Sequence, residues 1–337
     1  MTLLQHAPTL NLDEAATLAK ELYGLSTVQK ELPSERDQNF LVANNSGKRF
    51  VLKIANSHEQ RSLLEAQNAA LNHLQARITF TPHLVPARSG ESIEQILTES
   101  GSHYVRLITY ISGKPLANGG HSLSLLNDFG RKLGKLTQAL WDFDDQAFQR
   151  NFHWDLANAI RVIETYSQLI TPAALRGQIE KYASDFENAM KGHLGKLPLS
   201  VIHGDANDYN VVVQANEVVG VIDFGDMIHS YTIGELAIAL AYVVLDKLEP
   251  LTFANEVVAG YSAEFAVNDD ELETLWWLML MRLCMSVCLA AHQQQQKPEN
   301  EYLDISQQSI RNALPRLLAI DPRVATDLFS ESRIVQH

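Results

Sequence analysis

The stretch VIHGDANDYNVVVQANEVVGVIDFGD, residues 201–226, decides the fold of this chain. It places Asp205, Asn210 and Asp223 close together in the sequence, separated by runs of valine that favour β-strands. An EF-hand calcium loop needs a glycine at its sixth position and a glutamate at its twelfth. Counted from Asp205, these positions hold Asn210 and Asn216. The stretch is therefore not an EF-hand loop.

Two short β-prone runs within the stretch, NVVVQ and VVGVID, predict a hairpin. Pairing Val211 with Ile222 would place Asn210 opposite Asp223 at the open end of this hairpin. Asp205 lies on the loop that enters the same end. Two carboxylates and one amide oxygen would then converge.

Such a trio suits phosphoryl transfer. One carboxylate orients the attacking hydroxyl and accepts its proton, while hard oxygen ligands hold the Mg²⁺ ions that bridge the nucleotide phosphates. The spacing Asp-x4-Asn, followed after a hairpin by Asp-Phe-Gly, is the pattern of kinase catalytic and metal loops. We therefore predict Asp205 as the catalytic base and Asn210 and Asp223 as Mg²⁺ ligands. The alternative is an Asx-rich loop that only caps the hairpin.

The same chemistry calls for a strand lysine that neutralises nucleotide phosphates and for a helix glutamate that holds this lysine. The run RFVLKI supplies Lys53, and we expect Glu65 on the following helix to be its partner, in preference to Glu59. The segment LPSERDQNFLV, residues 32–42, occupies the place of the nucleotide-covering hairpin but contains no glycine. Phosphate contacts there would come from Ser34 or from backbone N–H groups.

The two parts of the chain differ in character. Residues 1–111 predict a mostly antiparallel sheet of about five strands with one inserted helix, whereas residues 112–337 are almost entirely helical apart from the hairpin. We therefore predict a protein-kinase-like, two-lobe α+β fold. The nucleotide would lie between the lobes, against a hinge near Thr109–Ile111. Helices are expected at 123–140, 155–169, 172–192, 231–246, 250–265, 269–293 and 301–318.

Composition limits the partners and the compartment. The formal charge of −13, from 40 acidic and 27 basic residues, disfavours binding to nucleic acid or to anionic membranes. The two cysteines, Cys284 and Cys288, offer neither a disulfide framework nor a zinc spacing. The N-terminal residues lack a secretory signal pattern, and Arg282 interrupts the longest apolar run. We expect a reduced, cytoplasmic, soluble protein.

The acceptor is expected to be a small molecule, not a protein. After residues 223–226 the chain enters a helix by about Thr232, which leaves no room for a long activation loop, and no Ala-Pro-Glu follows. A peptide-binding platform is therefore missing from the sequence.

Three side chains are candidates for acceptor contacts. Asp226 could bind an amine or fix its own loop, and Asp155 could bind an ammonium group or cap a helix. Arg282 lies on a strongly apolar helix, where it could bind a substrate carboxylate or form an internal salt bridge. We expect Trp276 to be a core residue, and His203 to brace the catalytic loop through backbone contacts.

With these residues identified, the chain resembles the aminoglycoside phosphotransferase and choline kinase superfamily over nearly its whole length. The most specific part is His203-Gly204-Asp205 through Asn210, followed by Ile222 to Asp226. The segments FVLKIAN, LLEAQNAALNHL and HWDLANA look most like the hydroxylysine kinase-like branch.

The resemblance implies a small-molecule kinase that uses Mg²⁺ and either ATP or GTP. The acceptor would be the hydroxyl of a hydroxylated amino acid or amino alcohol, with hydroxylysine the first choice. Homoserine kinase type II and aminoglycoside O-phosphotransferase are the alternative activities. A nucleotide-binding scaffold with an inactive site is the alternative without catalysis.

Overall fold

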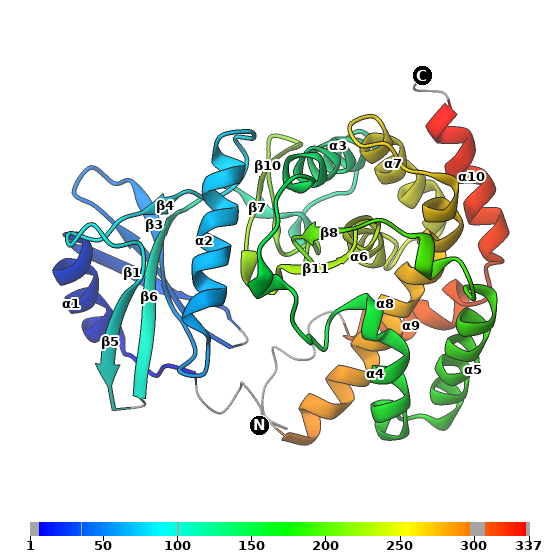
Figure 1. The fold of residues 1–337 in the computed structure, drawn as a ribbon, viewed down its shortest axis with the longest axis horizontal. Helices are drawn as coiled ribbons and strands as arrows, with labels where there is room; N and C mark the ends of the chain where they lie inside the picture. The colour runs from blue at the N-terminus through cyan, green and yellow to red at the C-terminus, as the bar shows by residue number, and fades with distance from the viewer. Residues whose placement is uncertain (1–6, 35, 100, 297–306, 335–337) are drawn as a thin grey trace. The chain divides into compact units, whose positions relative to one another are not determined.

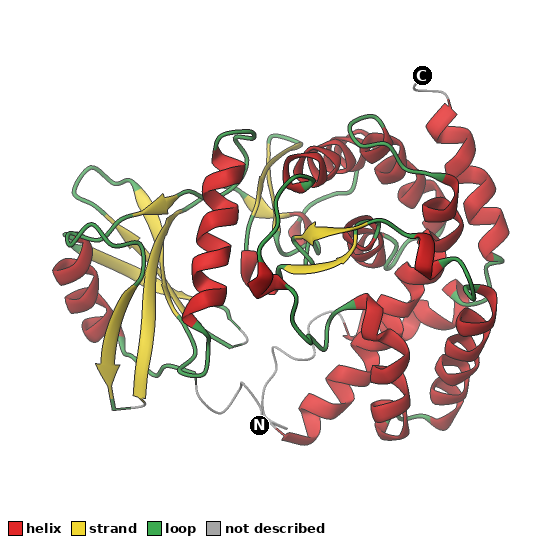
Figure 2. Cartoon of the chain, in the orientation of Figure 1, coloured by secondary structure: helices red, strands yellow, loops and turns green. Residues whose placement is uncertain are grey.

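The computed structural model describes residues 7–34, 36–99, 101–296 and 307–334. The chain divides into two compact units, Met1–Ser112 and Gly113–His337. Strands dominate the first unit and helices the second (Figure 2).

The first unit is built on a six-stranded antiparallel sheet in the order β1-β2-β3-β6-β4, with β5 also paired to β6. Helices α1 (Leu12–Tyr23) and α2 (Arg61–Gln75) lie on opposite sides of the sheet (Figure 1). The strands are β1 (Thr27–Leu32), β2 (Gln38–Ala43), β3 (Arg49–Ile54), β4 (Leu84–Val85), β5 (Glu94–Thr98) and β6 (Gly101–Thr109). Strand β5 is absent from the sequence prediction, because its polar residues give no clear apolar alternation.

Local sequence signals fix the ends of α1. The Asn11 side chain accepts hydrogen bonds from the backbone N–H groups of Asp13 and Glu14, and the Glu14 carboxylate accepts from the Asn11 N–H, which forms a capping box. Gly24 ends the helix at φ 70°, a conformation that glycine adopts without strain. The alternation of β3 then sends Leu52 and Ile54 into the core shared with α1 and points Lys53 to the other face of the sheet.

The second unit combines two small β-elements with a set of helices. Strands β7, β9 and β10 form one antiparallel sheet, and β8 pairs with β11. The strands are β7 (Lys114–Pro115), β8 (Leu199–Ile202), β9 (Val211–Gln214), β10 (Glu217–Val221) and β11 (Ile228–Tyr231). The helices are α3 (Leu123–Leu140), α4 (Ala159–Tyr166), α5 (Ala173–Ala189), α6 (Gly234–Val243), α7 (Pro250–Ser262), α8 (Asp269–Gln296), α9 (Gln307–Leu317) and α10 (Pro322–Ile334).

Helix α8 forms the centre of this unit. Nearly all its residues from Leu272 to Ala291 are buried, and it packs against α4, α6, α9 and α10 (Figure 1). Among the described residues it is the one helix long and apolar enough to cross a membrane, but its burial inside the protein is typical of a core helix. Sequence analysis missed α10 and the short strands β7, β8 and β11. The predicted helix at 301–318 begins in residues outside those described and is present as α9.

Candidate active site

The loop between β8 and β9 carries the central carboxylate of the site. Gly204 takes φ 78°, and a side chain there would place its Cβ 2.8 Å from the backbone oxygen of Asp226. Glycine therefore allows the loop to pack directly on the 224–226 turn. The side chain of Asp205, the next residue, is 22% exposed.

Both oxygens of the Asp205 carboxylate are held. Oδ1 accepts hydrogen bonds from Nη2 of Arg282 at 3.1 Å and from Nδ2 of Asn207 at 3.0 Å. Oδ2 accepts from Nδ2 of Asn210 at 2.8 Å. Burial and the charge of Asp226 raise the pKa of Asp205 to about 8, while the Arg282 guanidinium opposes this rise. The contacts fix the plane of the carboxylate.

The hairpin is present, but its register differs from the predicted one. Gln214 pairs with Glu217 across a two-residue turn at Ala215 and Asn216, and a bulge after Val218 then brings Val221, not Ile222, opposite Val211. Both turn residues have positive φ, as a tight hairpin turn of the primed type requires.

The metal-ligand candidates remain close together despite this shift in register. The N–H of Ile222 donates to the carbonyl oxygen of Asn210 at 2.9 Å, so Asp223 follows directly after the residue that pairs with Asn210. Nδ2 of Asn210 donates to Asp205, which leaves Oδ1 of Asn210 available as a ligand. Asp223 sits at φ 64° and ψ 76°, a left-handed conformation that is uncommon for aspartate and found at functional sites. An amide oxygen and a carboxylate are the donors that Mg²⁺ prefers, so these two residues fit the ion.

Buried groups support the loop from behind. The His203 ring accepts the N–H of Asp205 at Nδ1 (3.2 Å) and contacts the carbonyl oxygen of Ile222 through Nε2 (3.0 Å), which confirms its predicted bracing role. Burial lowers the pKa of His203, so the neutral ring serves here. The Glu235 carboxylate accepts the N–H groups of His203 at 2.5 Å and Gly204 at 3.4 Å. Burial raises the pKa of Glu235 to about 7.

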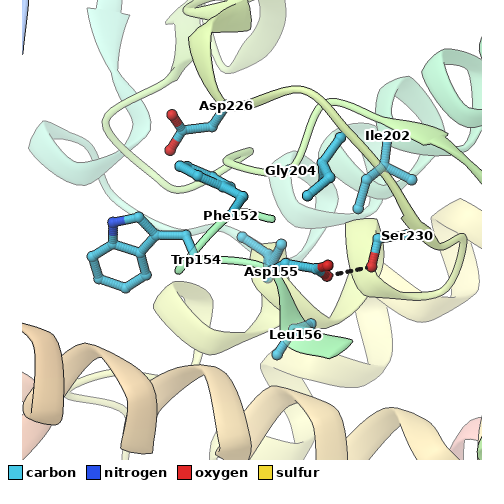
Figure 3. A pocket seen from close by; sticks show the side chains of 10 residues that line it. Phe152, Trp154, Asp155, Leu156, Ile202, Gly204, Asp226 and Ser230 are labelled. Carbon is cyan, nitrogen blue, oxygen red and sulfur yellow. Dashed lines mark hydrogen bonds between the residues drawn. The ribbon is translucent and has the colours of Figure 1, made fainter. Parts of the chain in front are cut away.

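A small cavity lies beside the loop and includes two of the acceptor candidates (Figure 3). Asp226 and Trp154 line it from different elements. Asp155, also in its wall, accepts hydrogen bonds from the N–H of Ala157 at 3.0 Å and from the hydroxyl of Ser230 at 2.5 Å. Asp155 therefore caps the short helix Leu156–Asn158, which is the structural alternative. Arg282 likewise forms an internal ion pair, with Asp205.

The predicted nucleotide residues lie in the first unit. Lys53 stands between Asn39 of β2 and Arg106 of β6 in the strand register. The expected partner Glu65 lies on the outer face of α2, with its side chain 55% exposed, and pairs with Arg61 at 2.8 Å. The prediction that Glu65 holds Lys53 does not match this placement, because the helix turns other residues toward the sheet.

Those other residues are polar as well. Gln67 and Asn68 of α2 are buried and accept hydrogen bonds from the Arg106 guanidinium at 2.8 and 2.9 Å. The hydroxyl oxygens of Ser34 and Thr109 already accept hydrogen bonds from the N–H groups of Asp37 (3.3 Å) and His83 (2.9 Å). Ile111, the end of the predicted hinge, is half-buried near the end of the first unit.

Comparison with known proteins identifies the family. Residues 28–273 match the model described as the phosphotransferase enzyme family (APH). The chain belongs to this phosphotransferase family. It is therefore an enzyme that transfers a phosphoryl group to a hydroxyl, and the predicted resemblance and enzyme class are confirmed.

Individual relatives of this phosphotransferase indicate which kind of acceptor the enzyme class uses. The chain is 33% identical over 341 residues to hydroxylysine kinase of Danio rerio, covering 94% of each protein. It is 28% identical over 353 residues to hydroxylysine kinase of Mus musculus, covering 96% of this chain and 94% of that protein. These matches support a small-molecule kinase.

Solved structures establish the fold of the phosphotransferase. Amicoumacin kinase, solved with AMP-PNP, Ca²⁺ and Ami, superposes with a TM-score of 0.72 at 15% identity, covering 94% of this chain and 97% of that one. A microcompartment-associated aminopropanol kinase superposes with a TM-score of 0.71 at 16% identity, covering 96% of this chain and 99% of that one. The predicted α+β kinase-like fold is confirmed.

Sequence analysis of the phosphotransferase missed several supporting residues. Arg150 donates to the carbonyl oxygens of Gly225 at 3.2 Å and Met227 at 3.0 Å, and so holds the turn that follows Asp223. Nothing in its sequence context indicates this contact. Glu235 offered a usable signal, because an acidic residue on an otherwise apolar helix must find buried donors.

Proposed function

We propose that this phosphotransferase transfers the γ-phosphoryl group of ATP to the hydroxyl of hydroxylysine. The observation that carries the proposal is the 33% identity, over 94% of both chains, to a hydroxylysine kinase. An amino alcohol is the nearest alternative acceptor, favoured by the similar fold of an aminopropanol kinase. ATP is preferred to GTP as the donor because a relative of the same fold was solved with AMP-PNP.

Asp205 would act as the base of the reaction. Its Oδ2 accepts the proton of the acceptor hydroxyl as the hydroxyl oxygen attacks the γ-phosphorus. The bond between the γ-phosphorus and the bridging oxygen breaks, and ADP leaves. The hydrogen bonds that fix the carboxylate orient Oδ2 before the acceptor arrives, so little reorganisation is needed at the moment of attack.

The remaining roles follow from the chemistry of the side chains. Oδ1 of Asn210 and the carboxylate of Asp223 would hold Mg²⁺, which when bound neutralises charge on the nucleotide phosphates. Lys53 of the first unit would contact the phosphates, with Ser34 and the Thr109–Ile111 segment as further nucleotide contacts. We assign nucleotide binding to the first unit and acceptor binding to the second, and we place the enzyme in the cytoplasm, since both cysteines are unpaired and buried.

The test is Mg²⁺-dependent ADP release across a panel of acceptors. The panel is hydroxylysine, homoserine, threonine, ethanolamine, 1-amino-2-propanol and kanamycin. Asp205→Asn removes the base and keeps the shape of the side chain. Asp144→Asn, at an exposed carboxylate, is the matched control.

Turnover of hydroxylysine that Asp205→Asn lowers to a small residual rate, and that Asp144→Asn retains, would establish the proposed activity. Preferential turnover of homoserine or kanamycin would move the enzyme to one of the alternative activities. Tight nucleotide binding with no turnover of any acceptor would favour the scaffold and refute the proposal.

A further inference from the structure

Arg282 is an arginine buried in the most apolar helix of the second unit. It lies in the middle of α8 between Met281 and Leu283, both fully buried, and its own side chain is 2% exposed. A buried guanidinium is costly unless charged and polar partners compensate for the lost water. The partners of Arg282 therefore indicate why a charge is placed in this helix.

The partners lie on three sides of the guanidinium. Nη2 donates to Oδ1 of Asp205 at 3.1 Å, and Nη1 donates to the carbonyl oxygen of Trp154 at 2.9 Å. The carbon Cζ lies 4.4 Å from the centre of the Trp154 ring, within the range of a cation–π contact. The Tyr242 side chain also forms a hydrogen bond with the guanidinium. Nε is buried and has no hydrogen-bond partner within the described parts of the chain.

This arrangement joins the proposed base to the wall of the neighbouring cavity. Asp205 lies on the loop after β8, and Trp154 belongs to the segment before α4 that lines the cavity. One rigid, planar side chain holds both, and its fork fixes their relative geometry, which the single nitrogen of a lysine does not. Oδ1 accepts from both Arg282 and Asn207, whereas Oδ2 accepts from Asn210, so Oδ2 is the oxygen with more capacity to accept a further proton donor.

We propose that Arg282 is a positioning residue, which fixes the Asp205 carboxylate and the Trp154 wall relative to each other for transfer to the acceptor. This inference rests on the proposed function, in which Asp205 is the base. It assigns Arg282 to the enzyme's own framework and not to a carboxylate of the acceptor, because the side chain is only 2% exposed, each Nη already donates within the protein and one face contacts Trp154.

The experiment compares Arg282→Gln and Arg282→Lys with the wild type in steady-state assays, using whichever acceptor the wild type phosphorylates. Arg333 is the matched control, because it also donates one Nη to a backbone carbonyl, that of Val267 at 2.8 Å, and the other to a carboxylate, that of Asp269 at 2.6 Å. Arg333→Gln should keep kcat within about twofold. Melting temperatures report whether each variant is folded.

We expect Arg282→Gln to lower kcat by about 100-fold, the scale of loss when a reacting group is misplaced by about 1 Å. The KM for ATP should stay within about twofold. Arg282→Lys should recover only part of kcat, since it restores the charge without the fork. Added to Asp205→Asn, Arg282→Gln should cause no further loss, because residues that act through one another are not additive.

The outcomes separate the two proposals. A wild type that phosphorylates no acceptor refutes the proposed function and this inference with it. An active wild type with full kcat in Arg282→Gln refutes the inference alone, as does a loss that multiplies with that of Asp205→Asn.

If Arg282→Gln does not fold, the double variant Asp205→Asn with Arg282→Met tests whether Arg282 and Asp205 are coupled. It removes both members of the ion pair, so recovery of folding supports the direct coupling of Arg282 to Asp205. Continued failure to fold shows that Arg282 serves packing alone and overturns the inference.

Discussion

Replacing Glu235 by glutamine tests how the catalytic loop is supported. The Glu235 carboxylate lies in the first turn of α6, fully enclosed, where Oε2 accepts the N–H groups of His203 and Gly204. Oε1 is buried with no hydrogen-bond partner among the described residues. Burial raises the pKa of this carboxyl to about 7. We therefore predict that Glu235 is protonated in the folded enzyme at mildly acidic pH.

The magnitude follows from the two pKa values of Glu235. The folded value of about 7 exceeds the ordinary value of 4.5, so between these pH values the folded enzyme keeps a proton that the unfolded chain has released. The free energy of unfolding then falls by about 1.36 kcal/mol per pH unit as the pH rises, and it levels off above pH 7. The full effect is about 3.4 kcal/mol, of which about 2.5 kcal/mol falls between pH 5 and pH 8.

The assay is urea unfolding of the wild type and Glu235→Gln at pH 5 and pH 8. Glutamine keeps an oxygen for both N–H groups but cannot ionise, so the pH-dependent difference should change by about 2.5 kcal/mol relative to the wild type. Contributions from other titrating groups cancel in this comparison. Glu331→Gln, at an exposed position of α10, is the control. A Glu235→Gln variant with the full wild-type pH dependence would refute the reasoning.

Three further predictions concern packing, metal and acceptor. Gly130→Ala should destabilise the enzyme by at least about 2 kcal/mol, because its Cβ would lie 2.0 Å from the carbonyl oxygen of Val257. Gly177→Ala, on an open face of α5, should instead stabilise the enzyme by about 0.5–1 kcal/mol. Thermal unfolding measures both changes. Asn210→Ala should raise the Mg²⁺ concentration for half-maximal activity by about tenfold or more, measured at saturating ATP. An amino alcohol that matches hydroxylysine but lacks its carboxylate should retain kcat/KM within about tenfold, because Arg282 is only 2% exposed and already donates to Asp205 and Trp154. A loss of about 1,000-fold would contradict this.

Local patterns in the sequence were sufficient for much of the fold. The apolar alternation of β3 and the capping signals of α1 determine those elements, and both depend on residues close together in the chain. The strand at Glu94–Thr98 was not predicted, because a half-exposed strand with polar residues lacks that alternation. The hairpin register was one residue off because the two-residue turn shifts the pairing by two residues from the predicted one and the bulge after Val218 restores one of them, and neither can be read from composition.

The face of a helix was harder to predict than the helix itself. Glu65 lies between buried residues of α2, and the sequence suggested that it faces the sheet. The buried polar positions are instead Gln67 and Asn68, which bind Arg106 of β6. Because Arg106 lies far from α2 in the sequence, no local pattern indicates that it contacts the helix. The polar face of α2 could therefore be assigned only from the structure.

The loop that carries Asp205 and the turn after Asp223 are held by side chains from three remote places in the second unit. Glu235 binds the backbone N–H groups of the loop, Arg150 binds the carbonyl oxygens of the turn after Asp223, and Arg282 binds the Asp205 carboxylate itself. The motif specifies which groups are present, but these supports set where each atom lies, and productive transfer depends on that placement. A chain with the same motif but without these three side chains would therefore keep the metal ligands and lose their placement. Comparing the activities of Glu235, Arg150 and Arg282 variants with that of Asp205→Asn separates the effect of misplacing the base from the effect of removing it.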